Sequence, residues 1–237
     1  MRWDYYNYVP VSEKKEAARK QLEKLLKKNP SMQPVIIEGR TIAKTFWGMA
    51  WNKNLESYAD YTNRIGRGRS YVKNGMVLDL YIEEGRIGGL VAGSRKTPYR
   101  VEIKIAPLAK DRWRAISEVC GRRIGGVEEL IEGKFPRAYA EVFLKQGTGL
   151  FPSPKDIRMS CSCPDWATLC KHAAAVLYAV GARLDVDPLL FFKLRGIGFG
   201  ELVAKSAGEK MESMLKNAGR RTRRVIDDAD VAGIFGV

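Results

Sequence analysis

The sequence predicts an α+β fold: an antiparallel β-meander with covering helices, followed by a small cysteine-containing module and a helical C-terminal region. Three observations lead to this prediction. Apolar and polar residues alternate between residues 69 and 106, as in strands with one buried face. Apolar residues recur at helical spacing before and after that stretch. Three cysteines and a histidine then lie within one stretch of 12 residues.

Ahead of the sheet, the pattern predicts a helix over residues 13–28. Ala18, Leu22 and Leu25 share one face of this helix, and lysines gather near its end, where they suit the helix dipole. Asparagine and prolines then stop the helix. A short apolar strand is expected over residues 35–37.

The sheet is expected to be preceded by an aromatic-rich helix over residues 46–61, which is the natural cover for its buried face. Asn74-Gly75 lies between two strand-like runs and predicts a tight hairpin. Glu84-Gly85 supplies a second turn. A later run alternates apolar residues with Arg100 and Lys104, which places these two side chains on the outer, charged face.

Beyond residue 110 the pattern becomes helical, with further helices expected over 127–131 and 136–145. Glycines and prolines between residues 147 and 154 form the best candidate boundary. We therefore expect an N-terminal helical extension over 1–34, an α+β domain over 35–147, the cysteine module over 148–185 and a helical C-terminal region with a basic tail over 186–237.

The candidate metal ligands are Cys161, Cys163, Cys170 and His172, because Zn²⁺ prefers tetrahedral coordination by thiolate and imidazole. In an extended strand, the first two cysteines lie on one face and can meet at one point. Positions two apart in a regular helix diverge, so Cys170 has to sit in the irregular entry turn of the following helix. Thr168 is the expected cap of that helix. The sequence therefore predicts a Zn²⁺ cofactor.

Four protein ligands close the coordination shell, whereas catalytic zinc keeps an open position. His172 is the only histidine in the chain, so none remains as a general base. Cys120 shares an apolar helix face with Trp113 and is expected in the core. We expect no enzymatic activity and no small-molecule substrate.

The motif Cys-x-Cys, a six-residue spacer and Cys-x-His before an apolar helix resembles the SWIM zinc finger. The surrounding sequence is similar to prokaryotic SWIM zinc finger proteins of this length from about residue 35 to residue 196. The resemblance implies a ββα finger with a structural zinc that binds DNA or proteins. It also implies a partner, since many such fingers accompany Swi/Snf-type helicase-like ATPases.

The formal net charge of +14 is spread over both halves of the chain, and such a surface attracts polyanions. The alternative is that this charge only keeps the protein soluble. No run approaches the roughly 20 apolar residues that span a bilayer, and residues 1–11 lack the apolar core typical of a signal peptide. We expect a cytoplasmic protein with no membrane partner.

Two basic groups are candidate nucleic-acid contacts. In the first, glycines separate the arginines, so that backbone can approach a phosphate closely in a loop. If the hairpin forms as expected, Arg69 and Tyr71 flank it, and Tyr71 and Tyr99 can stack on bases. The candidates are Arg64, Arg67, Arg69 and Tyr71 in the first group, and Arg95, Lys96 and Arg100 in the second.

Other interpretations of these residues are open. The arginines can equally be solvated surface residues or form ion pairs within the fold. Lys171 and Trp166 are weaker candidates, and Trp166 can instead pack beneath the zinc loop. The sequence therefore predicts a zinc-binding accessory protein that binds nucleic acid, most simply DNA, with low sequence specificity. The alternative is an adaptor that docks on a helicase-like ATPase without touching nucleic acid.

Overall fold

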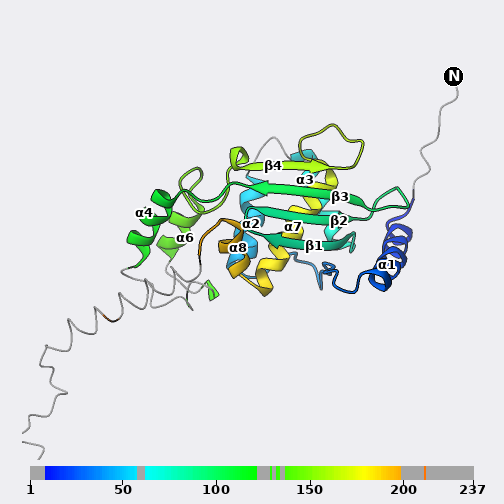
Figure 1. Ribbon diagram of the computed structural model, residues 1–237, viewed down its shortest axis with the longest axis horizontal. Coiled ribbons are helices and arrows are strands. Elements are labelled where there is room, and N and C mark those ends of the chain that lie inside the picture. Colours follow the sequence, from blue (N-terminus) through cyan, green and yellow to red (C-terminus); the bar gives the residue numbers. More distant parts are fainter. Residues whose placement is uncertain are drawn as a thin grey trace, which may run out of the picture.

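A four-stranded antiparallel sheet with strand order β1-β2-β3-β4 forms the centre of the computed structural model (Figure 1). The structure describes residues 9–57, 62–121, 129, 132–133, 137–198 and 211. The predicted α+β class with an antiparallel sheet is confirmed. The elements are α1 (Val11–Lys28), α2 (Phe46–Glu56), α3 (Thr62–Lys73), β1 (Val77–Glu83), β2 (Arg86–Val91), β3 (Tyr99–Ile105), α4 (Lys110–Gly121), α6 (Arg137–Leu144), a 3₁₀ turn (Pro154–Asp156), β4 (Ile157–Cys161), α7 (Lys171–Val186) and α8 (Leu189–Leu194).

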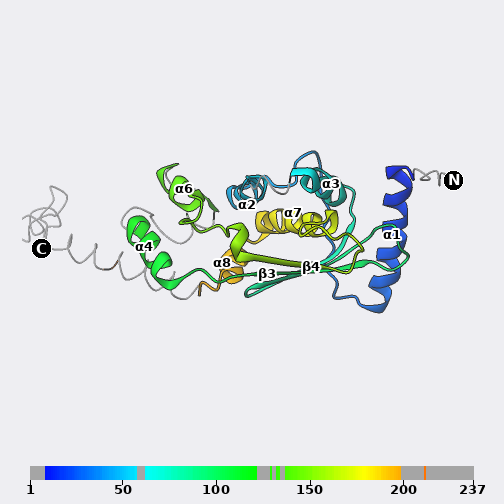
Figure 2. The ribbon, with the colours of Figure 1, turned by 90° about the horizontal axis from the view of Figure 1, so that it is seen from above.

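The sheet is one layer of three. One of its faces packs on α7, and α2 and α3 lie on the other side of α7 (Figure 2). Eleven of the sixteen α7 residues are buried, as expected for a helix that is apolar on all sides. The predicted cover was wrong: the aromatic helix α2 packs on α7, and α7 covers the sheet.

The cysteine module is not appended to this core. Its strand β4 pairs with β3 in the register Val101↔Cys161 to Ile105↔Ile157, and its helix is the central layer. The resemblance implied a ββα finger, and here the strand next to β4 is β3 of the main sheet. The glycine- and proline-rich segment at 147–154 therefore does not separate the module from the sheet.

The predicted hairpin at Asn74-Gly75 is also wrong. These residues end helix α3: the Met76 N–H donates to the Tyr71 carbonyl at 3.1 Å, and Gly75 has a positive φ of 68°. This is the glycine-terminated helix end that asparagine and glycine favour as much as they favour a hairpin. The turn at Glu84-Gly85 does join β1 to β2, as expected.

Several smaller predictions have clear outcomes. Helix α1 forms where expected. Residues 35–37 form no strand, but the Val35 N–H donates to the Val77 carbonyl at 3.1 Å, which holds this segment along β1. The helix expected over 127–131, the C-terminal tail and the Cys120 side chain lie outside the described residues. Within the described part of the chain, no helix is long and apolar enough to cross a bilayer.

Substitutions at two glycines of helix α3 can test how closely α3 packs against α7. A Cβ on Gly68 would lie 2.4 Å from the Ala174 Cβ and 2.8 Å from its carbonyl carbon, whereas a Cβ on Gly66 would meet nothing within 4 Å. Gly68→Ala should lower the free energy of unfolding by about 1–3 kcal/mol, because α3 and α7 must separate. The matched control Gly66→Ala should raise it by about 0.5–1 kcal/mol, because alanine favours helix more than glycine does. Urea denaturation measures both, and equal effects of the two substitutions would contradict this packing.

Candidate metal centre

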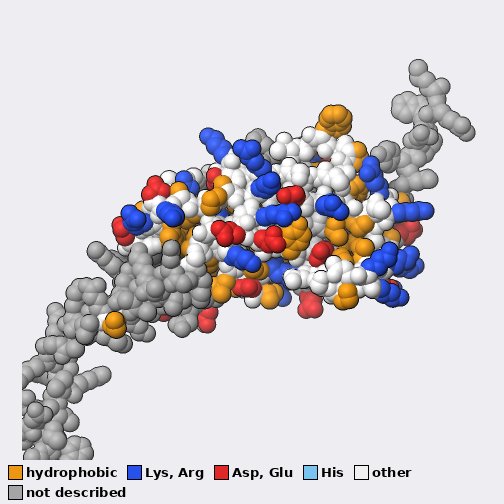
Figure 3. Space-filling model, in the orientation of Figure 1, with side chains coloured by type: hydrophobic (Ala, Val, Ile, Leu, Met, Phe, Trp, Pro, Cys, Tyr) orange, Lys and Arg blue, Asp and Glu red, His pale blue; other side chains and the backbone are white. Residues whose placement is uncertain are grey.

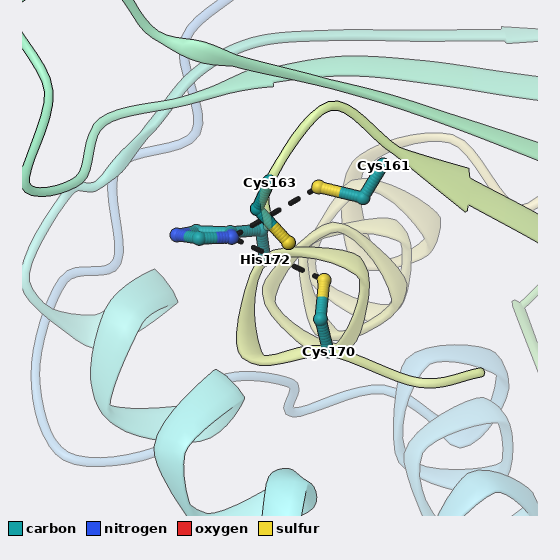
Figure 4. Close-up of side chains that lie close together, drawn as sticks. All are labelled: Cys161, Cys163, Cys170 and His172. Atoms are coloured by element: carbon teal, nitrogen blue, oxygen red, sulfur yellow. Dashed lines mark hydrogen bonds between the residues drawn. The ribbon is translucent and has the colours of Figure 1, made fainter. Parts of the chain in front are cut away.

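Four side chains from two elements and the loop between them converge on one point. Cys161 ends β4, Cys163 follows in the loop, Cys170 immediately precedes α7, and His172 lies in the first turn of α7 (Figure 4). Their three sulfur atoms and one imidazole nitrogen all lie within 4.8 Å of one another. The predicted ligand set is thus brought together in full.

The distances fit a tetrahedral zinc ion. The His172 Nδ1 atom lies 3.9 Å from the Cys161 Sγ and 4.0 Å from the Cys170 Sγ. Zinc bonds of about 2.3 Å to sulfur and 2.0–2.1 Å to nitrogen require tetrahedral edges of roughly 3.6–3.8 Å. Shifts of at most about 1 Å complete the shell, so the cluster is positioned to bind a zinc ion through three thiolates and Nδ1.

The entry turn of α7 explains how residues two apart both reach this point. Cys170 is the N-cap with an extended backbone, φ −83° and ψ 167°, and its sulfur accepts a hydrogen bond from the Ala173 N–H at 3.4 Å. His172 is already inside the helix. The expected irregular entry turn is confirmed, but the cap is Cys170 and not Thr168, because the helix begins at Lys171.

The imidazole of His172 is held between two aromatic rings. Tyr99 stacks on it with ring centroids 4.2 Å apart, and Tyr71 meets it edge-on at 5.5 Å. His172 as a whole is only 3% exposed. Its Nε2 atom has no hydrogen-bond partner among the described residues, so the two tyrosines, and not a second polar contact, orient this ligand.

The charges of the cluster favour a cation. Hydrogen bonds from the Cys161 thiol and then from His172 lower the pKa of Cys170 to about 3. The same bond to Cys170, together with burial, raises the pKa of Cys161, and burial raises the pKa of Cys163. Without metal the cluster thus holds one thiolate, because three neighbouring anions repel one another. A divalent ion removes that repulsion.

Two of the predicted nucleic-acid contacts are used within the fold. Arg64 forms an ion pair with Asp165 at 2.6 Å. Arg69 pairs with Glu56 and donates to the Tyr178 hydroxyl at 3.2 Å. The alternative interpretation, in which the arginines form ion pairs within the fold, is therefore correct for Arg64 and Arg69. The loop expected around them was wrong, because residues 62–73 form a helix.

The other members of the first group differ in exposure. Arg67 is exposed and has no ion pair among the described residues. Tyr71 is half-buried: its ring lies against His172, and the Lys171 amine lies 5.3 Å from its centroid. Tyr99 is 4% exposed. Both rings pack against the ligand His172, so neither is free to stack on a base. Sequence spacing could not predict these contacts.

The second group lies at one end of the sheet, and Arg100 is on the outer face of β3, as expected. Arg95 and Lys96 are exposed in the loop between β2 and β3, and Arg100 points outward from β3. The Arg95 guanidinium lies 5.6 Å from the Tyr99 ring centroid. In the described part of the chain none of the three has a carboxylate partner.

Sequence reasoning missed two features of the site. Arg158 of β4 is exposed opposite Lys104 of β3 and extends the basic row, and only the pairing of β4 with β3 reveals this. Asp165 fixes the zinc loop: besides its ion pair with Arg64, its Oδ1 accepts from the Ala167 N–H at 3.3 Å. The Cys-Pro-Asp turn was the available signal.

Comparison with known proteins agrees with the metal centre. Residues 156–181 match the model of the SWIM zinc finger family, and this chain contains such a finger. Over 172 residues the chain is 34% identical to a protein of Mycobacterium tuberculosis (strain ATCC 25618 / H37Rv) named "Uncharacterized protein Rv2102". The match covers 72% of this chain and 62% of that relative, so the chain spans less than two thirds of the relative's length. No solved structure matches the chain.

Substitution of one metal ligand tests whether zinc binding stabilises the fold. We expect Cys163→Ala to lose most of the zinc, about one ion per chain, and to weaken the whole sheet, because the metal joins β4 to α7. A decrease of about 5 kcal/mol in the free energy of unfolding lowers the melting temperature by roughly 10–20 °C in a chain of this size. Metal analysis and thermal circular dichroism measure both. Thr168→Ala, an exposed change in the same loop, is the control. Full zinc content in Cys163→Ala would refute the ligand set.

The raised and lowered thiol pKa values set the pH dependence of zinc binding. Cys161 and Cys163, with raised pKa values, are protonated at neutral pH, whereas Cys170 is ionised. Zinc therefore displaces two protons, and zinc affinity rises by about two log units per pH unit between neutral pH and the raised pKa values of Cys161 and Cys163. Chelator competition measures this slope, and proton release in weak buffer checks it. A slope near zero is incompatible with thiol displacement.

Proposed function

We propose that this SWIM zinc finger protein binds nucleic acid, most simply DNA, through exposed cations, and that its zinc is structural. One observation carries the proposal: a row of exposed Lys and Arg side chains crosses the open face of the sheet. Figure 3 shows Lys and Arg side chains spread over this face towards the end of the molecule occupied by α1, with Asp and Glu side chains among them. The row, which we name the basic strip, consists of Arg158, Lys104, Arg100, Arg95 and Lys96.

The register of the strands places Arg100, Lys104 and Arg158 on one face of the sheet, with Glu102 between Arg100 and Lys104. Lys104 on β3 lies directly opposite Arg158 on β4. Arg100 lies four residues from Lys104 on the same face, about 13 Å along the strand. Arg86, by contrast, pairs with Glu102 at 3.2 Å and Glu83 at 3.8 Å, so its positive charge is compensated by these carboxylates. The basic strip keeps its positive charge for an outside partner.

The chemistry of these contacts supports low sequence specificity. Lysine and arginine on a flat strand face reach phosphate oxygens, which carry no sequence information. A nonenzymatic role is supported by the ligand set, because three thiolates and one imidazole leave zinc no open position for water or substrate. We place the protein among those that hold nucleic acid without processing it.

The second candidate function is the adaptor that docks on a Swi/Snf-type helicase-like ATPase. It predicts no binding to duplex or single-stranded oligonucleotides at roughly 50 mM salt, where phosphate contacts are strong. It also predicts that such an ATPase is recovered with the protein from nuclease-treated lysate. Binding that falls steeply with salt supports the first candidate and counts against the second.

Neutralising part of the basic strip tests the proposed function. Arg100→Gln/Lys104→Gln should weaken binding at every salt concentration and lower the slope of log K against log salt by about 2, since two phosphate contacts are lost. The matched control Lys44→Gln/Lys53→Gln removes the same charge from exposed positions at α2, on the far side of α7. Fluorescence anisotropy across a salt series measures the slopes. Equal slopes for both pairs would refute the basic strip as the binding surface.

A further inference from the structure

Trp166 lies at the tip of the zinc loop with its side chain 100% exposed, the largest exposure of any described large hydrophobic residue. The alternative that it packs beneath the loop is thereby excluded. A tryptophan buries 150–250 Å² when it finds a partner, so full exposure leaves much apolar surface in water. The loop projects beyond the edge of the sheet next to β4 (Figure 1).

The exposure is not the result of a loosely held loop. Cys163 and Cys170, both ligands of the metal centre, enclose the segment that carries Trp166. Asp165, the preceding residue, forms the ion pair with Arg64 and accepts the Ala167 N–H. The indole is therefore presented to solvent from a fixed backbone, which lowers the entropic cost of using it in binding.

The surroundings of the zinc loop are basic. Arg100, part of the basic strip, is joined to the start of the loop: its N–H donates to the Ser162 Oγ at 2.9 Å, and the Ser162 N–H donates to its carbonyl at 3.0 Å. Lys171 follows the loop at its other end. Arg64 neutralises Asp165, the one acidic residue of the loop. An aromatic ring among cations is suited to an anionic partner that offers flat rings.

We infer that Trp166 stacks on an unpaired base of single-stranded nucleic acid whose phosphates follow the basic strip. The inference rests on the proposed function and limits the proposed ligand to single-stranded nucleic acid. Bases in a duplex are already stacked and hidden, so a ring at a loop tip gains a partner only from a single strand. A protein pocket suits the site less well, because the neighbouring Ser162, Pro164 and Thr168 are exposed and offer no cluster of further apolar anchors.

The test compares Trp166→Ala with Trp166→Phe in the zinc-loaded full chain, using a fluorescein-labelled thymidine oligonucleotide and a duplex of equal length. Trp166→Ala should weaken single-strand binding by about tenfold to a hundredfold, and Phe should retain most of the affinity. Duplex binding, zinc content and melting temperature should stay unchanged, since the side chain touches solvent only. Met49→Ala, another exposed apolar change on α2, is the control and should alter nothing.

Intrinsic fluorescence gives a second measurement. The chain has five tryptophans, of which Trp47 and Trp51 are fully buried. The emission that Trp166→Phe loses is therefore that of the exposed indole, and quenching of this component by the unlabelled oligonucleotide would report the stacking directly. Unchanged affinity in Trp166→Ala, or equal losses for duplex and single strand, would overturn the inference while leaving the proposed function intact. Absence of any oligonucleotide binding by the wild type would refute both. Capture of a protein partner through Trp166 would overturn the stacking inference alone.

Discussion

The burial of α7 is the constraint on which the rest of the structure depends. This helix is apolar on every side and lies between the sheet and the pair α2 and α3, so each neighbour must approach it closely. Glycines make the approach possible: a Cβ on Gly68 would overlap Ala174, and one on Gly89 of β2 would lie 2.8 Å from a Val176 methyl. Small residues on both sides bring α3, α7 and β2 into contact.

The position of α7 makes the zinc centre part of the main core. The metal ligands join the end of β4 to the start of α7, and β4 pairs with β3. The rings of Tyr99 and Tyr71 on either side of His172 come from β3 and α3, so the ligand sphere touches both layers that enclose α7. We therefore expect metal binding to be coupled to folding of the sheet, unlike in a finger that folds by itself.

The parts of the structure that could be predicted were those with an unambiguous local signal. Four soft ligands at fixed spacing identify a zinc site, and strict alternation identifies β1 and β3. Asn74-Gly75 was misassigned because the pair suits a helix end as well as a hairpin. Arg64 and Arg69 could not be assigned, since their partners lie 101 and 13 residues away in the chain. The glycines of α3 disfavour helix locally, and only packing on α7 overrides that preference.

The electrostatics of the zinc loop connect the metal to the proposed ligand. Zinc with three thiolates carries a formal charge of 2 − 3 = −1, which by itself repels phosphate. Asp165 adds a second negative charge, and Arg64 cancels it. The N-terminus of α7 and Lys171 offset the charge of the metal centre from the helix side. Arg64 was expected to meet nucleic acid directly. Its ion pair instead keeps the loop close to neutral, so that Trp166 and the basic strip can face one polyanion together.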